Sequence, residues 1–266
     1  MVARSPNRLL IVDFILFLNI CLAIWTINVF GQGTFPGNNL FPLLIRSTIL
    51  LVAVVISYYL NYKFSRKNLL NFGILKFKSR LITSYLGGIV IGCVLIATIW
   101  GSIYLIYPFE IIKNLHSKNN LAIDIISYSL GNTLEEFFFR GFILLASEKF
   151  FGKIGGILFV SLFFCLFHLQ GSGLTAIGLS MVMTTFTMSL LLIAVIYYTK
   201  SIWTAVTLHI TGNLLIHSFG FDGTNNGLFQ LKFTTSTIND LFLTLIYEIV
   251  VITFAVVIFF KGNKQI

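Results

Sequence analysis

Three ionisable residues lie close together in a run of the sequence that is otherwise apolar. Glu135, Glu136 and Arg140 occur in the segment NTLEEFFFR, which occupies residues 132–140. A carboxylate can act as a general base that activates water, and a guanidinium can pair with a second carboxylate. On a helix, Glu136 and Arg140 share a face because they are four residues apart, whereas Glu135 lies about 100° around the axis. The spacing predicts that Glu136 pairs with Arg140 and that Glu135 is the carboxylate that does chemistry.

Three of the four histidines also lie in apolar segments: His168, His209 and His217. On a helix, His209, Asn213 and His217 form one stripe because they are spaced four apart. Two histidines from different helices, together with a carboxylate and an asparagine, supply a base, an orienting group and donors for an oxyanion. This set indicates water activation more strongly than packing, although the ionisable cluster taken alone is equally typical of a proton-coupled transporter. For His217 we expect a packing role.

The composition indicates which solvent surrounds these residues. The chain of 266 residues is 57% hydrophobic and 10% charged, and its mean hydropathy is +0.92. Soluble domains carry roughly 25% charged residues, so an ordinary soluble globular protein is excluded. The formal net charge is +9. In a membrane protein this charge indicates basic loops that face an anionic lipid leaflet rather than binding to nucleic acid.

Apolar segments long enough to cross a bilayer, which needs roughly 20 residues, recur along the whole chain. The predicted spans lie near residues 9–30, 40–60, 81–107, 121–147, 154–170, 174–198, 202–219 and 240–260. The fold class predicted is therefore all-α, a polytopic transmembrane bundle of about eight spans in a single membrane domain, 1–266. The chemistry-bearing core occupies about 121–219. Two short spans keep seven or nine crossings open, and the first segment is expected to be a retained span rather than a cleaved signal.

The distribution of basic residues predicts the orientation of the spans. Alternate loops hold 13 Lys and Arg on one side and 3 on the other, namely Lys113, Lys118 and Lys232. Short cytoplasmic loops carry the excess of positive charge, so both termini and the basic segment 61–80 are predicted to be cytoplasmic.

Two sets of small residues are assigned no chemistry. Gly88 and Gly92, four residues apart in the third predicted span, indicate close packing between helices. Cys21, Cys93 and Cys165 lie inside apolar runs without metal-binding spacing, and we expect them to be core residues.

Three short motifs occur in order, each in a different predicted span: EExxxR at 135–140, FxxxH at 164–168 and HxxxN at 209–213. In order and spacing they resemble the CPBP family of intramembrane proteases, also called the Abi or type II CAAX prenyl endopeptidase family. The motifs cover about residues 130–220. The resemblance implies an all-helical membrane fold, a cavity that opens to the cytoplasm, and endopeptidase activity.

The resemblance also implies a role for each motif residue. Glu135 and His168 would activate the attacking water, and His209 and Asn213 would stabilise the tetrahedral oxyanion. Three further residues would support the site: Glu136, Arg140 and Phe164.

The resemblance leaves two mechanisms open. The family is described as metalloproteases, and Glu135, His168 and His209 could bind a catalytic zinc ion with water as the fourth ligand. The same groups can activate water without a metal, and the chain has no HExxH pair on one helix. The cofactor expected is therefore either none or zinc, and the sequence slightly favours none.

The substrate is expected to be a membrane-associated peptide or protein. Relatives that resemble eukaryotic CAAX proteases cleave lipidated substrates, whereas bacterial relatives are associated with bacteriocin immunity and peptide processing. A short, single-domain chain favours a membrane-associated peptide and a location in the cell membrane. Two other functions stay open: a proton-coupled transporter, and a non-catalytic bacteriocin-immunity protein.

Overall fold

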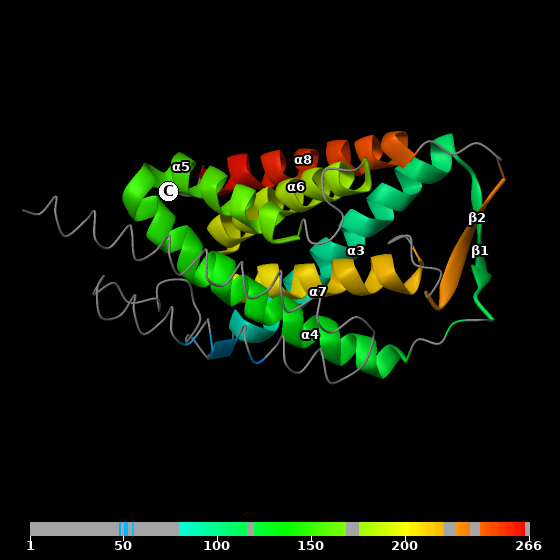
Figure 1. The fold of residues 1–266 in the computed structure, drawn as a ribbon, viewed down its shortest axis with the longest axis horizontal. Helices are drawn as coiled ribbons and strands as arrows, with labels where there is room; N and C mark the ends of the chain where they lie inside the picture. Colours follow the sequence, from blue (N-terminus) through cyan, green and yellow to red (C-terminus); the bar gives the residue numbers. More distant parts are fainter. Residues whose placement is uncertain are drawn as a thin grey trace, which may run out of the picture. The chain divides into compact units, whose positions relative to one another are not determined.

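Helices form nearly all of the described structure (Figure 1). The computed structural model describes residues 80–115, 117, 120–168, 176–220, 227–234 and 240–263, with positions 48, 51, 52 and 55. The elements in chain order are α3 (Arg80–Ile106), β1 (Phe109–Lys113), α4 (Leu121–Phe138), the π-helical turn η2 (Phe139–Ile143), α5 (Leu144–His168), α6 (Ala176–Thr199), α7 (Ile202–Ser218), β2 (Phe229–Phe233) and α8 (Asp240–Asn263). The predicted all-α class is confirmed.

The chain divides into two compact units. Unit 1 contains Met1–Leu69 and Phe137–Phe186, and unit 2 contains Leu70–Glu136 and Thr187–Ile266. One boundary falls inside α4, directly after Glu136, so the EExxxR motif contributes its glutamates to unit 2 and its arginine to unit 1.

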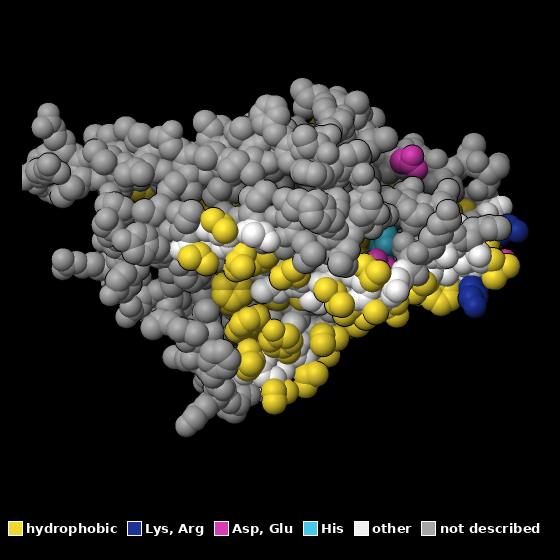
Figure 2. Space-filling view, turned by 60° about the horizontal axis from the view of Figure 1, so that its bottom comes forward, with side chains coloured by type: hydrophobic (Ala, Val, Ile, Leu, Met, Phe, Trp, Pro, Cys, Tyr) yellow, Lys and Arg dark blue, Asp and Glu magenta, His cyan; other side chains and the backbone are white. Residues whose placement is uncertain are grey.

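Several of these helices fit a membrane. Four helical stretches are long and apolar enough to cross one, namely Leu81–Ile106, Leu121–His168, Gly178–Thr199 and Asp240–Lys261. The third to eighth predicted spans all fall on helices, with α7 the shortest at 17 residues. The first two predicted spans lie outside the described residues, so the total of eight stays a prediction. The described side chains visible in Figure 2 are chiefly apolar, as expected for a surface that faces lipid.

The long stretch Leu121–His168 is interrupted within unit 1 at Gly152. Its φ of 71° and ψ of 175° lie outside the helical region, in a conformation that glycine adopts readily. Beyond this residue the chain turns back on itself (Figure 1), and Ser147 Oγ lies 3.4 Å from the carbonyl oxygen of Gly156. A Cβ on Gly156 would lie 2.7 Å from the backbone nitrogen of Glu148. The two arms of this turn correspond to the fourth and fifth predicted spans.

The glycine pair of α3 packs against α7 in unit 2. A Cβ on Gly88 would overlap the Thr204 carbonyl and the Thr207 hydroxyl, and a Cβ on Gly92 would lie 3.0 Å from Thr211 Cβ. The close helix packing predicted from the Gly88 and Gly92 spacing is confirmed. The close contact between α3 and α7 matters for the site because α7 carries His209 and Asn213.

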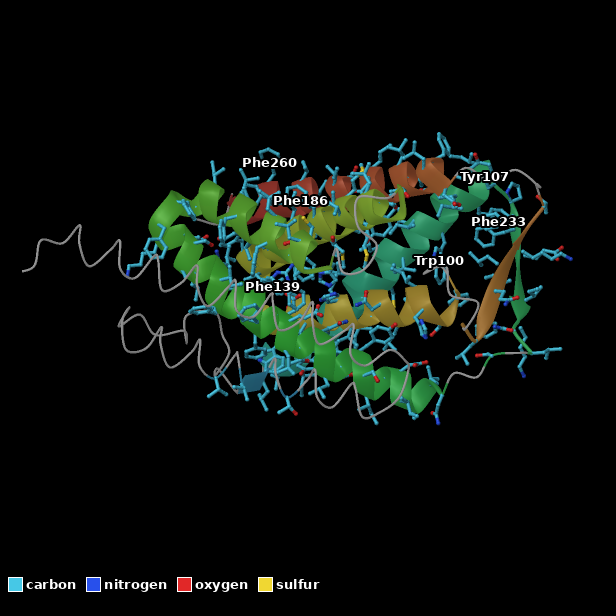
Figure 3. All side chains as sticks on the ribbon, in the orientation of Figure 1. Trp100, Tyr107, Phe139, Phe186, Phe233 and Phe260 are labelled. Carbon is cyan, nitrogen blue, oxygen red and sulfur yellow. The ribbon has the colours of Figure 1, made fainter. Side chains whose placement is uncertain are left out.

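A two-stranded sheet was not predicted from the sequence. β1 and β2 pair antiparallel, with Phe109 opposite Phe233 and Glu110 opposite Lys232. The pairing brings the segment after α3 and the segment after α7 to the same end of unit 2. Aromatic side chains gather there, including Trp100, Tyr107 and Phe233 (Figure 3). Such clusters are typical of the ends of membrane spans.

Candidate functional site

A ladder of polar side chains connects α4 to α7 in unit 2. The polar ladder consists of three pairs: Glu136–His209, Asn132–Asn213 and Asp124–His217. The order of the pairs shows that the two helices run antiparallel. On α7 the three residues are four apart and share one face, whereas on α4 the intervals are four and eight residues.

The first pair of the ladder is buried. His209 Nδ1 lies 2.8 Å from Glu136 Oε1, and the two side chains are 6% and 0% exposed. A carboxylate oxygen accepts, so Nδ1–H is the donor. This bond fixes the orientation of the His209 ring. A carboxylate behind a functional histidine is a common device for orienting the ring and stabilising charge on it.

The second pair consists of two asparagines. Asn213 Nδ2 donates to Asn132 Oδ1 at 3.2 Å. Asn132 is 5% exposed, and its own Nδ2 has no hydrogen-bond partner within the described part of the chain. The pair therefore presents one buried N–H donor group next to the Glu136–His209 bond.

The third pair is the most exposed. His217 Nε2 lies 3.8 Å from Asp124 Oδ2, with the side chains 14% and 20% exposed. The ring of Tyr128 meets the His217 ring edge-on, with 5.6 Å between the centroids. We expected His217 to be a packing residue, and the structure adds an acidic partner for it.

The two adjacent glutamates differ in their surroundings. Glu136 is fully buried, whereas Glu135 is half-buried. This difference agrees with the helical geometry that assigns them to different faces. Glu136 Oε1 accepts a hydrogen bond from His209, a partner that the sequence did not predict. Arg140 belongs to the other compact unit, and the Glu136–Arg140 ion pair stays a prediction.

Unit 1 holds a separate cluster of three motif residues. The Arg140 guanidinium carbon lies 4.3 Å from the centroid of the Phe164 ring, a cation–π distance. The Phe164 and His168 rings are 4.4 Å apart, and His168 Nδ1 lies 2.8 Å from the Phe164 carbonyl oxygen. Because a carbonyl only accepts, Nδ1 carries a proton in this contact. Phe164 thus supports both Arg140 and His168.

The local backbone around Arg140 is unusual. Residues Phe139–Ile143 form a π-helical turn, in which the Leu144 N–H bonds to the Phe139 carbonyl. All five residues of the turn are buried, and Arg140 is 1% exposed. Single π turns inside α-helices occur frequently at functional sites, since the wider turn shifts the side chains that follow.

The donors expected for zinc are distributed over both units. Glu135 and His209 belong to unit 2, and His168 belongs to unit 1. Within neither unit do three described His, Cys, Asp or Glu side chains form a group that could hold a metal ion.

Three polar residues were not assigned a role from the sequence. Asn132 and Asp124 belong to the polar ladder. They lie four and twelve residues before Glu136, and this spacing was a signal that could have identified them. Glu248 on α8 is 4% exposed, and its carboxylate interacts with the Thr187 side chain of α6. The signal in the sequence for Glu248 was a carboxylate in the middle of an apolar span.

Comparison with known proteins agrees with the three motifs. Residues 117–215 match the family model described as type II CAAX prenyl endopeptidase Rce1-like. The matched segment contains the residues that form both clusters, apart from His217. No curated protein matches the sequence.

Proposed function

The chain belongs to the CPBP family through its Rce1-like segment, 117–215, and on this basis we propose that it is an intramembrane endopeptidase that cleaves a membrane-associated peptide. The observation that carries the proposal is the buried Glu136–His209 hydrogen bond within the matched segment. A buried carboxylate–imidazole pair costs desolvation free energy, which a purely structural contact between apolar helices would not require.

His209 is proposed to stabilise the transition state. Glu136 accepts a hydrogen bond from Nδ1–H and so orients the ring, and the doubly protonated ring would donate from Nε2–H to the carbonyl oxygen of the scissile bond. That oxygen becomes negative when water attacks, and a donor placed beforehand lowers the barrier. Glu136 is in this scheme a positioning residue, because it acts through His209.

Glu135 is proposed to activate the water, a role that the motif resemblance gives to Glu135 and His168. Glu135 is half-buried in unit 2. It would take a proton from water as the water oxygen bonds to the carbonyl carbon. It would then return the proton to the leaving nitrogen as the C–N bond breaks. The proton that water loses on attack is the one that the leaving nitrogen gains, so the reaction needs no further reactant.

The test uses purified protein in detergent with internally quenched peptides, both prenylated CAAX peptides and unmodified bacteriocin-type peptides. We expect cleavage of at least one class, and Glu135→Gln should abolish it. Glu110→Gln makes the same chemical change on the exposed strand β1 and should retain activity. Intact peptides with folded wild-type protein would refute the proposal, and substrate-dependent proton uptake in liposomes would then indicate a carrier. Full biological function of Glu135→Gln would instead indicate a non-catalytic immunity protein.

A separate measurement tests the metal-free mechanism. Activity should persist after chelation and dialysis, and metal analysis of the active protein should find well under one zinc per chain. Reversible loss of activity on chelation, with about one equivalent of zinc in the active protein, would show that a metal takes part.

A further inference from the structure

The Asn132 side chain is a buried amide whose oxygen, but not whose nitrogen, takes part in a hydrogen bond among the described residues. Its Oδ1 accepts the Asn213 Nδ2 proton at 3.2 Å, and it is 5% exposed. Its Nδ2 has no hydrogen-bond partner in the part of unit 2 that the structure describes. A buried donor without an acceptor is unfavourable in a folded protein, and such groups call for a specific explanation such as a bound ligand or a catalytic role.

The position of Asn132 relates it to the proposed catalytic residues. It lies three residues before Glu135 and four before Glu136, which places it one helical turn away from both, about 5 to 6 Å along the axis. Its partner Asn213 lies one turn after His209 on α7. The unused amide donor is therefore a neighbour of both the proposed base and the proposed oxyanion donor.

The chemistry of the group points to an oxygen ligand. An amide N–H donates without ever losing its proton, so it can stabilise developing negative charge throughout a reaction. The hydrogen bond from Asn213 holds the amide in one orientation before substrate binds, and such preorganisation makes a donor effective in catalysis. Asn213 donates from Nδ2 to Asn132 Oδ1 and thereby holds the Asn132 amide in place. In this arrangement Asn213 is a positioning residue.

We propose that Asn132 Nδ2 donates a hydrogen bond to the carbonyl oxygen of the scissile peptide bond, beside His209 Nε2, and that Asn213 orients it. The inference rests on the proposed protease function. It differs from the assignment that the motif resemblance implies, in which Asn213 is the donor to the oxyanion.

The experiment measures kcat and KM for the peptide that the wild-type protein cleaves. Asn132→Asp keeps the acceptor for Asn213 and removes the donor, and we expect kcat to fall about 10²-fold or more with KM changed less than about threefold. Asn213→Ala removes only the orienting bond and should cost less. The double variant Asn132→Ala with Asn213→Ala should be no slower than Asn132→Ala, because both act on one donor.

A matched control separates catalysis from folding. Asn114 is 6% exposed in the same unit, and its Nδ2 donates to the Gly227 carbonyl at 2.9 Å. Asn114→Ala should lower the thermal midpoint and leave kcat near the wild-type value. If Asn132→Asp keeps kcat within about twofold while Asn213→Ala loses activity, Asn213 is the donor and this inference is wrong. A fall in kcat that merely follows the thermal midpoint, as in the control, would also overturn it. Wild-type protein without activity would refute the proposed function instead.

Discussion

At the scale of single residues, burial distinguishes the pairs of the polar ladder. The Glu136–His209 side chains are 0% and 6% exposed, whereas those of Asp124–His217 are 20% and 14% exposed. Both pairs join an acid on α4 to a histidine on α7, so they differ chiefly in contact with solvent. Water screens an exposed pair and lowers its contribution, while removing one partner of a buried pair leaves an uncompensated polar group.

This difference predicts unequal responses to substitution. Glu136→Ala and His209→Ala should each destabilise the protein by about 3–5 kcal/mol, and the double variant by clearly less than the sum. The corresponding changes at Asp124 and His217 should each cost about 1 kcal/mol or less. Thermal unfolding in detergent, evaluated as a double-mutant cycle for each pair, measures both. Additive effects at Glu136 and His209 would contradict the coupling.

Glu248 gives a second prediction at this scale. Its carboxylate is buried in α8 and interacts with the Thr187 side chain. One hydroxyl contact offsets only part of the cost of burying a carboxylate, so Glu248→Leu should raise stability by about 1–3 kcal/mol. The readout is the thermal midpoint together with cleavage activity. Ile246→Val, a small truncation at another buried position of α8, is the control and should lower the midpoint slightly. A less stable Glu248→Leu protein would mean that the carboxylate has a stabilising partner.

At the scale of helices, the position of α7 depends on glycines in α3. A methyl group on Gly88 would overlap Thr204 and Thr207, and Leu208 N would lie 2.9 Å from it. Leu208 directly precedes His209, so any displacement of α7 at this point acts on the Glu136–His209 bond. The packing of α3 against α7 therefore supports the site although neither glycine belongs to it.

Alanine substitutions along α3 test this dependence. Gly88→Ala should destabilise the protein by about 1–3 kcal/mol and reduce cleavage, with a smaller effect for Gly92→Ala. Gly101→Ala is the control, because no atom of the described residues lies within 4 Å of a Cβ at that position, and it should gain up to about 1 kcal/mol from helix propensity. Equal behaviour of Gly88→Ala and Gly101→Ala would refute the role of close packing.

At the scale of the molecule, the β1–β2 sheet bears on how the chain crosses the membrane. The strands carry Lys113 and Lys232, two of the three basic residues assigned to the sparsely charged side. Their pairing requires the two segments to share one side, as the count of Lys and Arg predicts. Which side this is depends on the positive-inside preference of the other loops.

Cysteine labelling in intact cells tests the orientation. In a background without Cys21, Cys93 and Cys165, a membrane-impermeant thiol reagent should label Ser117→Cys and Ser236→Cys but not Ser65→Cys. Permeabilised cells, in which all three positions should react, provide the control. Labelling of Ser65→Cys in intact cells would reverse the predicted topology, and labelling of only one of the other two would contradict the pairing of their segments.

The sequence by itself determined the features that depend on local pattern. Apolar length predicted the membrane helices from 81 onward, the interval of four predicted the shared face of His209, Asn213 and His217, and three motifs predicted the family. The interval between Gly88 and Gly92 predicted close packing. These features depend on helix geometry and on transfer of side chains into lipid, which act on neighbouring residues and can be read along the chain.

The tertiary structure decided which polar groups meet across helices. Helix spacing predicts Arg140 as a partner of Glu136, and the structure adds a hydrogen bond to His209, which lies 73 positions later in the chain. It likewise paired Asn132 with Asn213, and β1 with β2. A buried carboxylate takes the donor that packing brings within hydrogen-bond distance, and the contact of α4 with α7 depends on the fold of all of unit 2. Spacing along one helix restricts which side chains share a face, but it does not select the helix that this face contacts.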